Sequence, residues 1–377
     1  IMKKMKIIHF QNAYTDYLSE LHNLLANNEV NIKYLWCRKM DYWKATNFNN
    51  KNYDQKKVKY FLIPLMTSLS SKYTEAVSFE VLVNIIKYRP KILIIDSNTV
   101  FSFGYLLIAK LLKSKIISFT STLPNKKLFV SKISNLLLIL NDWLVDDYVV
   151  PIKSKKEDMI KMKINPEKIN VIGHGVNIQK FNPSNENRIE SLPKNKRIIL
   201  CVGALNSKKG QKYLIESFDI LSKNTTDICL VLIGDGQNKS QIIKEIENRK
   251  LNDKIIHLSK IPNSEIARYY VNADIVVIPS IEPEPFGRAY LEAMAMEKPI
   301  ITFDAKGGEK DIIENGKNGM IVKLKDVQSM ANNIKKLLED KEQRRTLGSN
   351  AREHVKKNYD YPIISNHWKK ILEKYIS

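Results

Sequence analysis

Two carboxylates stand eight positions apart in the second half of the chain, at Glu284 and Glu292, with a Pro-Phe-Gly turn between them. The apolar run at residues 273–280 predicts a buried strand before the turn, and the Ala- and Met-rich run at residues 291–296 predicts a helix after it. A loop that leads from a strand to a helix N-terminus is an anion site, because backbone N–H groups and the helix dipole favour a phosphate there. Carboxylates would repel that anion, so they are better placed as acceptors for neutral hydroxyls. The pattern predicts a ligand with hydroxyls on both sides of a diphosphate, such as a sugar nucleotide.

A lysine follows another predicted strand end. Lys209 comes after the strand expected at residues 197–203 and a short loop, and it precedes Gly210, which would open a helix. An ammonium group at this place can neutralise a diphosphate as a point charge. The alternative is a solvated loop lysine, as the adjacent Lys208 suggests.

Strands and helices alternate along the chain, which predicts parallel sheets with helices on both faces. The expected strands are residues 6–10, 92–96, 115–119 and 148–152 in the first half, and residues 197–203, 228–234, 255–259, 275–280, 299–304 and 320–322 in the second. An irregular segment that ends near Pro193 marks a linker between the halves. In open α/β sheets the ligand lies beyond the carboxyl ends of the strands, where the residues singled out above fall.

Three segments need separate interpretations. Residues 40–60 are polar and without clear periodicity, which predicts a long loop. Residues 128–144 are apolar around most of a helix, which predicts a buried helix, with insertion of its edge into a membrane surface as the alternative. Residues 361–375 have the pattern of an amphipathic final helix.

The Glu-x7-Glu pattern of Glu284 and Glu292 resembles the signature of retaining glycosyltransferases of the GT-B fold, of the family-four type called glycosyl transferases group 1. Other segments resemble that family's motifs in the same order along the chain. They are the linker Gly175-Val176-Asn177 with Phe181, the strand, loop and Lys-Gly of residues 202–210, the Gly-x-Gly strand end of residues 232–236, and the loops at Gly307-Gly308-Glu309 and residues 314–319. The ordered set is specific, whereas a single Glu-x7-Glu is common by chance.

The resemblance implies an α/β fold of GT-B architecture, with two Rossmann-like, doubly wound parallel-sheet domains that face a cleft. An acceptor-side domain is expected at residues 1–180 and a nucleotide-sugar-binding domain at residues 181–355. A C-terminal helix at residues 356–377 is expected to return to the first domain.

The resemblance also implies roles for individual residues. Glu284 would bind the donor sugar near its anomeric carbon, Lys209 would neutralise the diphosphate, and Glu292 would bind the ribose. The other residues expected to bind the donor are Phe286, Gly287, Arg288, Gly203, Gly234, Gly236, Ser259 and Ile261. Those expected on the acceptor side or in the cleft are Asn12, Thr120, Thr122 and His174.

The chain departs from the family pattern at three places. Many relatives have a phosphate-binding arginine where this chain has Ala204, and a glycine-rich loop where residues 11–13 contain none. Many also have a histidine near the reacting carbon, after the strand that Thr120 follows here. These departures keep open a catalytically degenerate protein that binds nucleotide sugars.

The resemblance implies transfer of a hexose-type sugar, with retention, from a nucleoside diphosphate donor to a saccharide or lipid-linked acceptor. No Asp-x-Asp pair stands at a strand end, so no metal site is expected, and no cofactor is expected beside the nucleotide sugar. Besides the degenerate binding protein, a sugar-nucleotide epimerase is an alternative.

Composition limits these expectations. A chain of 377 residues favours two domains, and three scattered cysteines favour a reducing cytoplasm over a disulfide framework. No apolar run reaches the roughly 20 residues that span a bilayer.

The net charge is +21, and residues 1–180 hold 28 Lys and Arg against 14 Asp and Glu. Three explanations stay open: the amino-acid bias of a low-GC genome, attraction to an anionic membrane surface, and, last, nucleic acid. The chain lacks a recognised nucleic-acid motif, so no such partner is expected.

Overall fold

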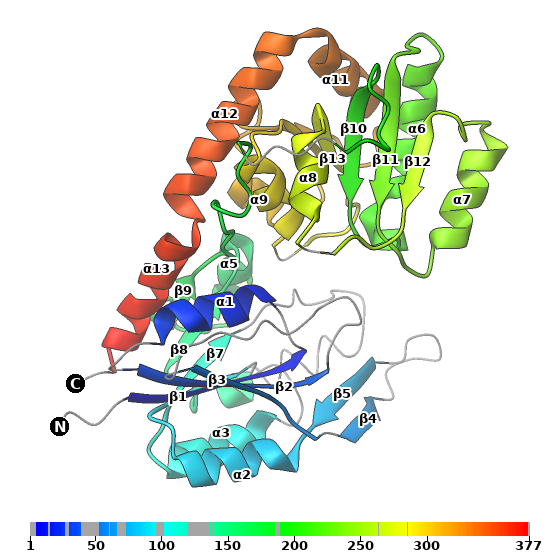
Figure 1. Cartoon of the computed structure of the whole chain (residues 1–377). Coiled ribbons are helices and arrows are strands. Elements are labelled where there is room, and N and C mark those ends of the chain that lie inside the picture. The colour runs from blue at the N-terminus through cyan, green and yellow to red at the C-terminus, as the bar shows by residue number, and fades with distance from the viewer. Residues whose placement is uncertain are drawn as a thin grey trace. The chain divides into compact units, whose positions relative to one another are not determined.

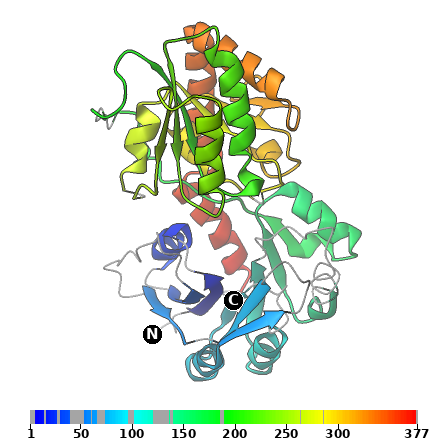
Figure 2. The same cartoon turned by 90° about the vertical axis from the view of Figure 1, so that its right-hand side faces the viewer.

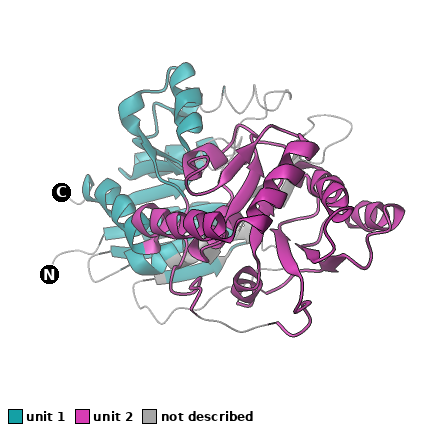
Figure 3. Ribbon diagram, turned by 90° about the horizontal axis from the view of Figure 1, so that it is seen from above, with its two compact units in different colours: residues 1–173, 362–377 teal, residues 174–361 magenta. Residues whose placement is uncertain are grey.

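The computed structural model divides into two compact units (Figure 1, Figure 3). Unit 1 comprises Ile1–Gly173 and Pro362–Ser377, and unit 2 comprises His174–Tyr361. The structure describes residues 5–13, 16–26, 30–38, 53–59, 61–65, 73–95, 102–119, 136, 139–184, 189–262, 264–284 and 286–375.

Unit 1 contains a parallel sheet of seven strands within the described ranges, in the order β3-β2-β1-β6-β7-β8-β9. The strands are β1 (Met5–Ala13), β2 (Val30–Arg38), β3 (Tyr53–Lys57), β6 (Ile92–Ile95), β7 (Lys115–Phe119), β8 (Asp147–Val150) and β9 (Ile169–Val171). Parallel neighbours require crossover connections. The helices between them are α1 (Asp16–Leu25), α2 (Phe79–Tyr88), α3 (Ser102–Leu111) and α5 (Lys153–Lys161), and a separate antiparallel pair joins β4 (Phe61–Leu65) to β5 (Tyr73–Val77).

Helices α2 and α3 cover one face of this sheet side by side, as Figure 1 and Figure 2 show. Val81 and Ile85 of α2 pack into the same core cluster as Leu106 and Ala109 of α3. The two helices therefore turn their buried sides toward the same sheet face.

The C-terminal helix α13 (Tyr361–Glu373) and the residues after it pack against strands β7 and β8 of the unit 1 sheet. Its Trp368 ring lies 5.8 Å from the ring of Phe119 in β7. Just beyond the helix, Lys374 forms an ion pair of 3.0 Å with Asp147 of β8, and the Tyr375 hydroxyl donates to the same carboxylate. These contacts tie the last residues of the chain to strands more than two hundred residues earlier.

Unit 2 contains a second parallel sheet, of six strands in the order β12-β11-β10-β13-β14-β15. The strands are β10 (Arg197–Val202), β11 (Ile228–Ile233), β12 (Ile255–Leu258), β13 (Ile275–Ile278), β14 (Ile300–Phe303) and β15 (Met320–Val322). The helices are α6 (Gln211–Ser222), α7 (Lys239–Asn248), α8 (Ile266–Val271), α9 (Arg288–Ala295), α10 (Glu309–Ile312), α11 (Val327–Glu339) and α12 (Lys341–Asn358). The strand order reverses between β10 and β13, and such a switch point is where open α/β sheets bind ligands.

The predicted class of two parallel-sheet α/β domains is confirmed. The long loop predicted at residues 40–60 is wrong in part, because residues 53–57 form the edge strand β3, whose polar sequence gave no strand signal. The strand β2 was not predicted either, although its apolar residues alternate with Asn31 and Lys33. Most of residues 128–144 lies outside the described ranges, but Ile139 and Trp143 are exposed, against the expectation of burial on most sides. In the part of the chain that the structure describes, no helix is long and apolar enough to cross a membrane.

Candidate active site

The predicted donor-binding residues of unit 2 gather along one edge of its sheet. Gly203, Gly234 and Ser259 follow the adjacent parallel strands β10, β11 and β12, and Ser280 lies two residues beyond β13. Because neighbouring parallel strands end at the same edge, the loops after them meet there.

Two glycines let the first two of these loops touch backbone to backbone. Gly234 has φ +154°, and a Cβ atom there would lie 1.9 Å from the carbonyl oxygen of Gly203. Gly236 has φ +157°, and its Cβ would lie 2.3 Å from the carbonyl oxygen of Leu205. The Gly-x-Gly pattern thus serves close loop packing here.

The loop that carries Lys209 rests on the loop after β13. Gly210 has φ +65°, and a Cβ atom there would lie 2.0 Å from the carbonyl oxygen of Pro279. The amide of Ile281 donates to the carbonyl oxygen of Lys208 at 2.8 Å. This contact holds the two loops in a fixed register.

The consequence is that Lys209 and Glu284 form an ion pair, with 2.6 Å between Nζ and Oε2. Their neighbours Lys208 and Glu282 form a second pair of 3.1 Å that is much more exposed. The sequence predicted both Lys209 and Glu284 as site residues but not that they contact each other.

Hydrogen bonds hold both the side chain and the backbone of Glu284. The Ser280 hydroxyl donates to Oε1 of Glu284, and the amide of Gly308 donates to the backbone carbonyl oxygen of Glu284 at 2.8 Å. A Cβ on Gly307 would lie 2.6 Å from the backbone nitrogen of Glu284. The buried carboxylate of Glu309 accepts from the Gly307 amide at 2.9 and 3.1 Å, so it holds the loop that supports Glu284. Burial raises the pKa of Glu309.

Glu292 points into a buried polar environment within α9. The hydroxyl of Tyr270, from α8, donates to Oε2 at 3.1 Å, and Arg288 lies 3.5 Å from Oε1 one turn earlier on the same helix. Burial raises the pKa of Glu292, while the charge of Arg288 and the hydrogen bond from Tyr270 oppose that shift. Neither Ser280 nor Tyr270 was singled out from the sequence, because a lone serine or tyrosine carries no spacing signal.

Phe286 and Gly287 shape the start of α9. The Phe286 ring is buried, 5.1 Å from the ring of His174 and 5.6 Å from that of Tyr359. Gly287 precedes the helix, and its Cβ would meet the Tyr290 ring at 2.5 Å. The Phe286 side chain is thus used for packing, which leaves its backbone for ligand contacts.

His174 belongs to this packing cluster in unit 2. Burial, followed by the positive charge of Arg288, lowers the pKa of His174 to about 3. The imidazole is therefore neutral near pH 7.

The structure describes only some of the remaining site residues that were predicted from the sequence. Ser259 is exposed and accepts a hydrogen bond from Lys239 at 3.2 Å, and Ile261 is partly exposed two residues further on. Asn12 is the second-last residue of strand β1, and its side chain lies outside what the structure describes. Thr120 and Thr122 lie outside the described residues.

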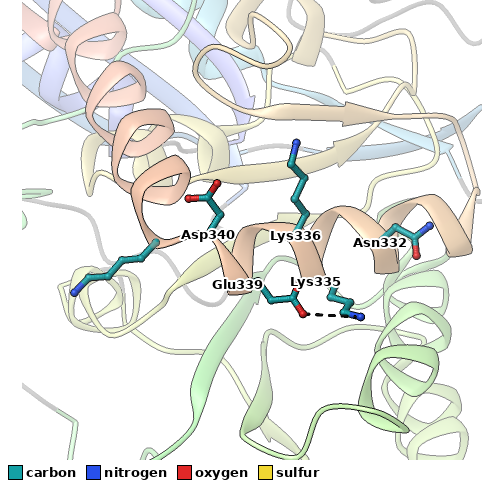
Figure 4. A pocket seen from close by; sticks show the side chains of 6 residues that line it. Asn332, Lys335, Lys336, Glu339 and Asp340 are labelled. Atoms are coloured by element: carbon teal, nitrogen blue, oxygen red, sulfur yellow. Dashed lines mark ion pairs between the residues drawn. The ribbon is translucent and has the colours of Figure 1, made fainter.

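An open depression of about 600 Å³ lies elsewhere on unit 2, at the junction of α11 and α12 (Figure 4). Its lining residues are Asn332, Lys335, Lys336, Glu339, Asp340 and Lys341. Arg197, the first residue of β10, donates to the carbonyl oxygen of Leu338 in α11. The depression is therefore near the amino ends of the strands, away from the edge that carries Glu284.

Known proteins resemble this chain in both sequence and structure. Residues 184–354 match the family model of glycosyl transferases group 1. The capsular polysaccharide biosynthesis glycosyltransferase CapM of Staphylococcus aureus is 30% identical over 244 residues, 61% of this chain and 61% of that protein. The sulfoquinovosyl transferase SQD2 of Arabidopsis thaliana is 27% identical over 80% of this chain and 58% of its own length.

Among solved structures, Anabaena Alr3699/HepE in complex with UDP-glucose has a TM-score of 0.78 and 17% identity, and the match covers 98% of this chain and 100% of that one. The chain matches 61%, 56% and 49% of the length of three curated relatives. The match to the family model lies within unit 2, which carries the Glu-x7-Glu pair, while the structural match extends over nearly the whole chain. Residues 184–354 therefore match the glycosyl transferases group 1, and the fold of the chain is GT-B.

Proposed function

We propose that the protein is a retaining glycosyltransferase that transfers a hexose-type sugar from a nucleoside diphosphate donor to a hydroxyl of a saccharide or lipid-linked acceptor. It needs neither a metal ion nor a further cofactor in this proposal, because Lys209 and the amides at the start of α9 face the diphosphate. Unit 2 binds the donor, and unit 1 contributes the acceptor side. The name of one relative, a capsular polysaccharide biosynthesis glycosyltransferase, supports a saccharide acceptor.

The ion pair between Lys209 and Glu284 is the observation that carries this proposal. It places a cation and a carboxylate side by side at the switch-point edge of the sheet, each on a loop fixed by backbone contacts. In this arrangement the two groups neutralise each other. When the donor binds, Lys209 turns to the diphosphate and Glu284 becomes an acceptor for sugar hydroxyls.

The chemistry follows from these positions. As the bond to the leaving diphosphate lengthens, negative charge grows beside Lys209 and positive charge grows on the anomeric carbon near Glu284, so both charges are stabilised where they develop. The acceptor hydroxyl attacks the anomeric carbon from the face that the diphosphate leaves, which retains the configuration, and its proton passes to an oxygen of the departing diphosphate. Glu292 has a second oxygen held only loosely by Arg288, so its carboxylate can accept from a ribose diol.

The first test is the variant Glu284→Gln, with Glu282→Gln as a matched control two residues away. Glu284→Gln removes the charge but keeps the shape, so transfer should fall by at least about a hundredfold, the size typical of a lost electrostatic contact at a reacting centre. Nucleoside diphosphate binding, followed by thermal shift, should persist. Transfer at the wild-type rate would reject Glu284 as a catalytic residue, and loss of activity in EDTA would reject the metal-free part of the proposal.

A second candidate function is a degenerate binding protein. Ala204 supports it, because the position has no arginine and its carbonyl oxygen instead accepts from the Gln211 side chain at 3.0 Å. The same assays separate the two functions: nucleotide-sugar binding with neither transfer nor donor hydrolysis supports the binding protein. Conversion of the donor to its epimer would point to the epimerase alternative.

We also propose that the protein acts in the cytoplasm and associates with the inner face of the membrane. The excess of Lys and Arg in residues 1–180 supports this, since anionic lipid attracts basic segments by about 1 kcal/mol per nearby charge. Lys126, Lys127 and Lys132, which flank the apolar run in the sequence, lie outside the described residues.

A further inference from the structure

Exposed apolar side chains gather on unit 1. Among the described residues, fourteen large apolar side chains are exposed, and ten of these lie on α2, on α3 or within residues 136–143. Of the described residues of unit 2, only Leu324 belongs to this set. Scattered exposed apolar residues are ordinary, but a concentration on adjacent elements marks an interaction surface.

The exposed residues form a stripe on each of the two helices. On α2, Val83 and Ile86 are exposed one turn apart, opposite the buried Ile85. On α3, Phe103, Leu107 and Leu111 repeat at every fourth position, and Leu111 is 74% exposed. Each helix has one apolar side in the core and a second apolar side exposed. The packing of unit 1 alone does not explain why the exposed side is apolar.

The two stripes face the same way. Both helices bury their opposite sides in one core cluster on one sheet face, and they lie next to each other in Figure 1 and Figure 2. Their outer sides therefore form one continuous surface.

Residues 139–143 extend this surface along α3. The Asn141 side chain donates to the Ser102 hydroxyl at 3.4 Å at the start of α3, and Lys110 of α3 donates to the Leu144 carbonyl oxygen at 3.2 Å. Trp143 lies between these anchors and is 66% exposed, and Ile139 and Leu140 just before Asn141 are exposed as well. We call the set of exposed residues Val83, Ile86, Phe103, Leu107, Leu111, Ile139, Leu140 and Trp143 the apolar face.

Basic residues border the apolar face. Lys87 and Arg89 lie at the end of α2 and Lys113 just after α3, and all three are exposed. Residues 79–91, 102–115 and 139–146 together hold six Lys and Arg and three acidic residues, Glu80, Asp142 and Asp146. Glu80 is paired with Lys56 at 2.5 Å, and Asp146 is paired with Lys110 and Lys115, so Lys87, Arg89 and Lys113 carry the excess positive charge. Two copies of such a face would repel each other, whereas anionic lipid headgroups would attract it.

We propose that the apolar face of unit 1 docks on an anionic lipid bilayer. The apolar side chains enter the boundary between headgroups and acyl chains, and Lys87, Arg89 and Lys113 contact lipid phosphates. The inference deepens the proposed membrane association and rests on it, because it assigns the surface that makes the contact. It needs neither donor binding nor transfer.

Sedimentation of the full chain with vesicles tests the proposal at physiological salt. Wild type should bind vesicles of phosphatidylglycerol and phosphatidylcholine but not phosphatidylcholine alone. The double variant Leu107→Ser with Leu111→Ser should lose about tenfold or more in partitioning, from lost apolar insertion. Leu324→Ser is the apolar control on unit 2 and should bind like wild type.

A charge pair separates specific docking from overall charge. Lys87→Glu with Lys113→Glu should also lose at least about tenfold in partitioning, because each reversal removes an attraction and adds a repulsion. Lys335→Glu with Lys341→Glu, exposed residues of unit 2, change the net charge equally and should have little effect. Equal losses from both pairs would overturn the proposal in favour of diffuse charge.

Tryptophan fluorescence locates the contact. The fluorescence emission of Trp143 should shift to the blue on binding and be quenched by brominated lipid. Trp143→Phe should remove this change in emission while vesicle binding persists.

Absence of vesicle binding by wild type overturns the proposal, as does a lipid-free dimer that Leu107→Ser with Leu111→Ser dissociates. Thermal shift with nucleoside diphosphates on the same variants should be unchanged, so a failure of donor binding in wild type would count against the enzyme function and not against this surface.

Discussion

At the scale of single residues, the site depends on which of two neighbouring charges is held by the fold. Lys208 and Lys209 are adjacent, and Glu282 and Glu284 are two residues apart on one loop, yet the two ion pairs differ in setting. The pair of Lys209 and Glu284 lies between loops joined by backbone contacts, while the other pair is exposed to solvent. Exposed ion pairs contribute little, so position and not charge distinguishes the two lysines.

This difference predicts the effect of removing each lysine. Lys209→Ala should weaken nucleoside diphosphate binding by about tenfold to a hundredfold, because a charge-assisted contact to phosphate contributes about 1.5–3 kcal/mol. Lys208→Ala should leave the affinity unchanged. Calorimetric titration with a nucleoside diphosphate measures both, and the nucleoside without phosphates is the ligand control. Equal losses from the two variants would mean that the loop senses overall charge only.

At the scale of elements, sequence patterns identified where the strands of unit 2 end but not how the loops after them meet. The Glu-x7-Glu spacing was informative because both glutamates lie in one short segment, Glu284 in a loop and Glu292 in the second turn of the helix that follows it. Ser280 and Tyr270 were missed because their roles depend on contacts between elements: the first reaches Glu284 across a turn, and the second reaches from α8 to α9. The edge strand β3 was missed because an exposed edge imposes no apolar period on its residues.

The contact between α8 and α9 gives a prediction for Tyr270. Tyr270→Phe keeps the buried ring but removes the donor to Glu292, so the pKa of that carboxyl should rise further above its ordinary value. Nucleotide affinity should fall by roughly threefold to tenfold, the effect of one hydrogen bond, and should fall more at acidic pH. Tyr269→Phe on the same helix is the matched control. Affinities of Tyr270→Phe that equal those of wild type from pH 5.5 to 8 would exclude a positioning role.

At the scale of the whole molecule, each unit has its own core, and unit 1 buries an unusual pair in its core. His9 of β1 and His22 of α1 are both wholly buried, with 2.8 Å between Nδ1 of His9 and Nε2 of His22. The rings of Tyr34 and Phe119 lie against His9. A hydrogen bond between two imidazoles requires that one donates and the other accepts, so at least one ring must stay neutral.

The pair makes the stability of the chain depend on pH. Burial lowers the pKa of His22 to about 3, and burial together with the nearby His22 lowers the pKa of His9 well below its ordinary value. Below an unfolded-state pKa of about 6.5 the unfolded chain binds protons that the folded chain does not, so the free energy of unfolding falls as the pH falls, by up to about 1.4 kcal/mol per pH unit for each histidine. Urea unfolding from pH 7.5 to 4.5 should show this slope. His22→Gln should make it shallower, whereas replacing the exposed His367 with Gln should not. A slope unchanged by His22→Gln would place the acid sensitivity in other groups.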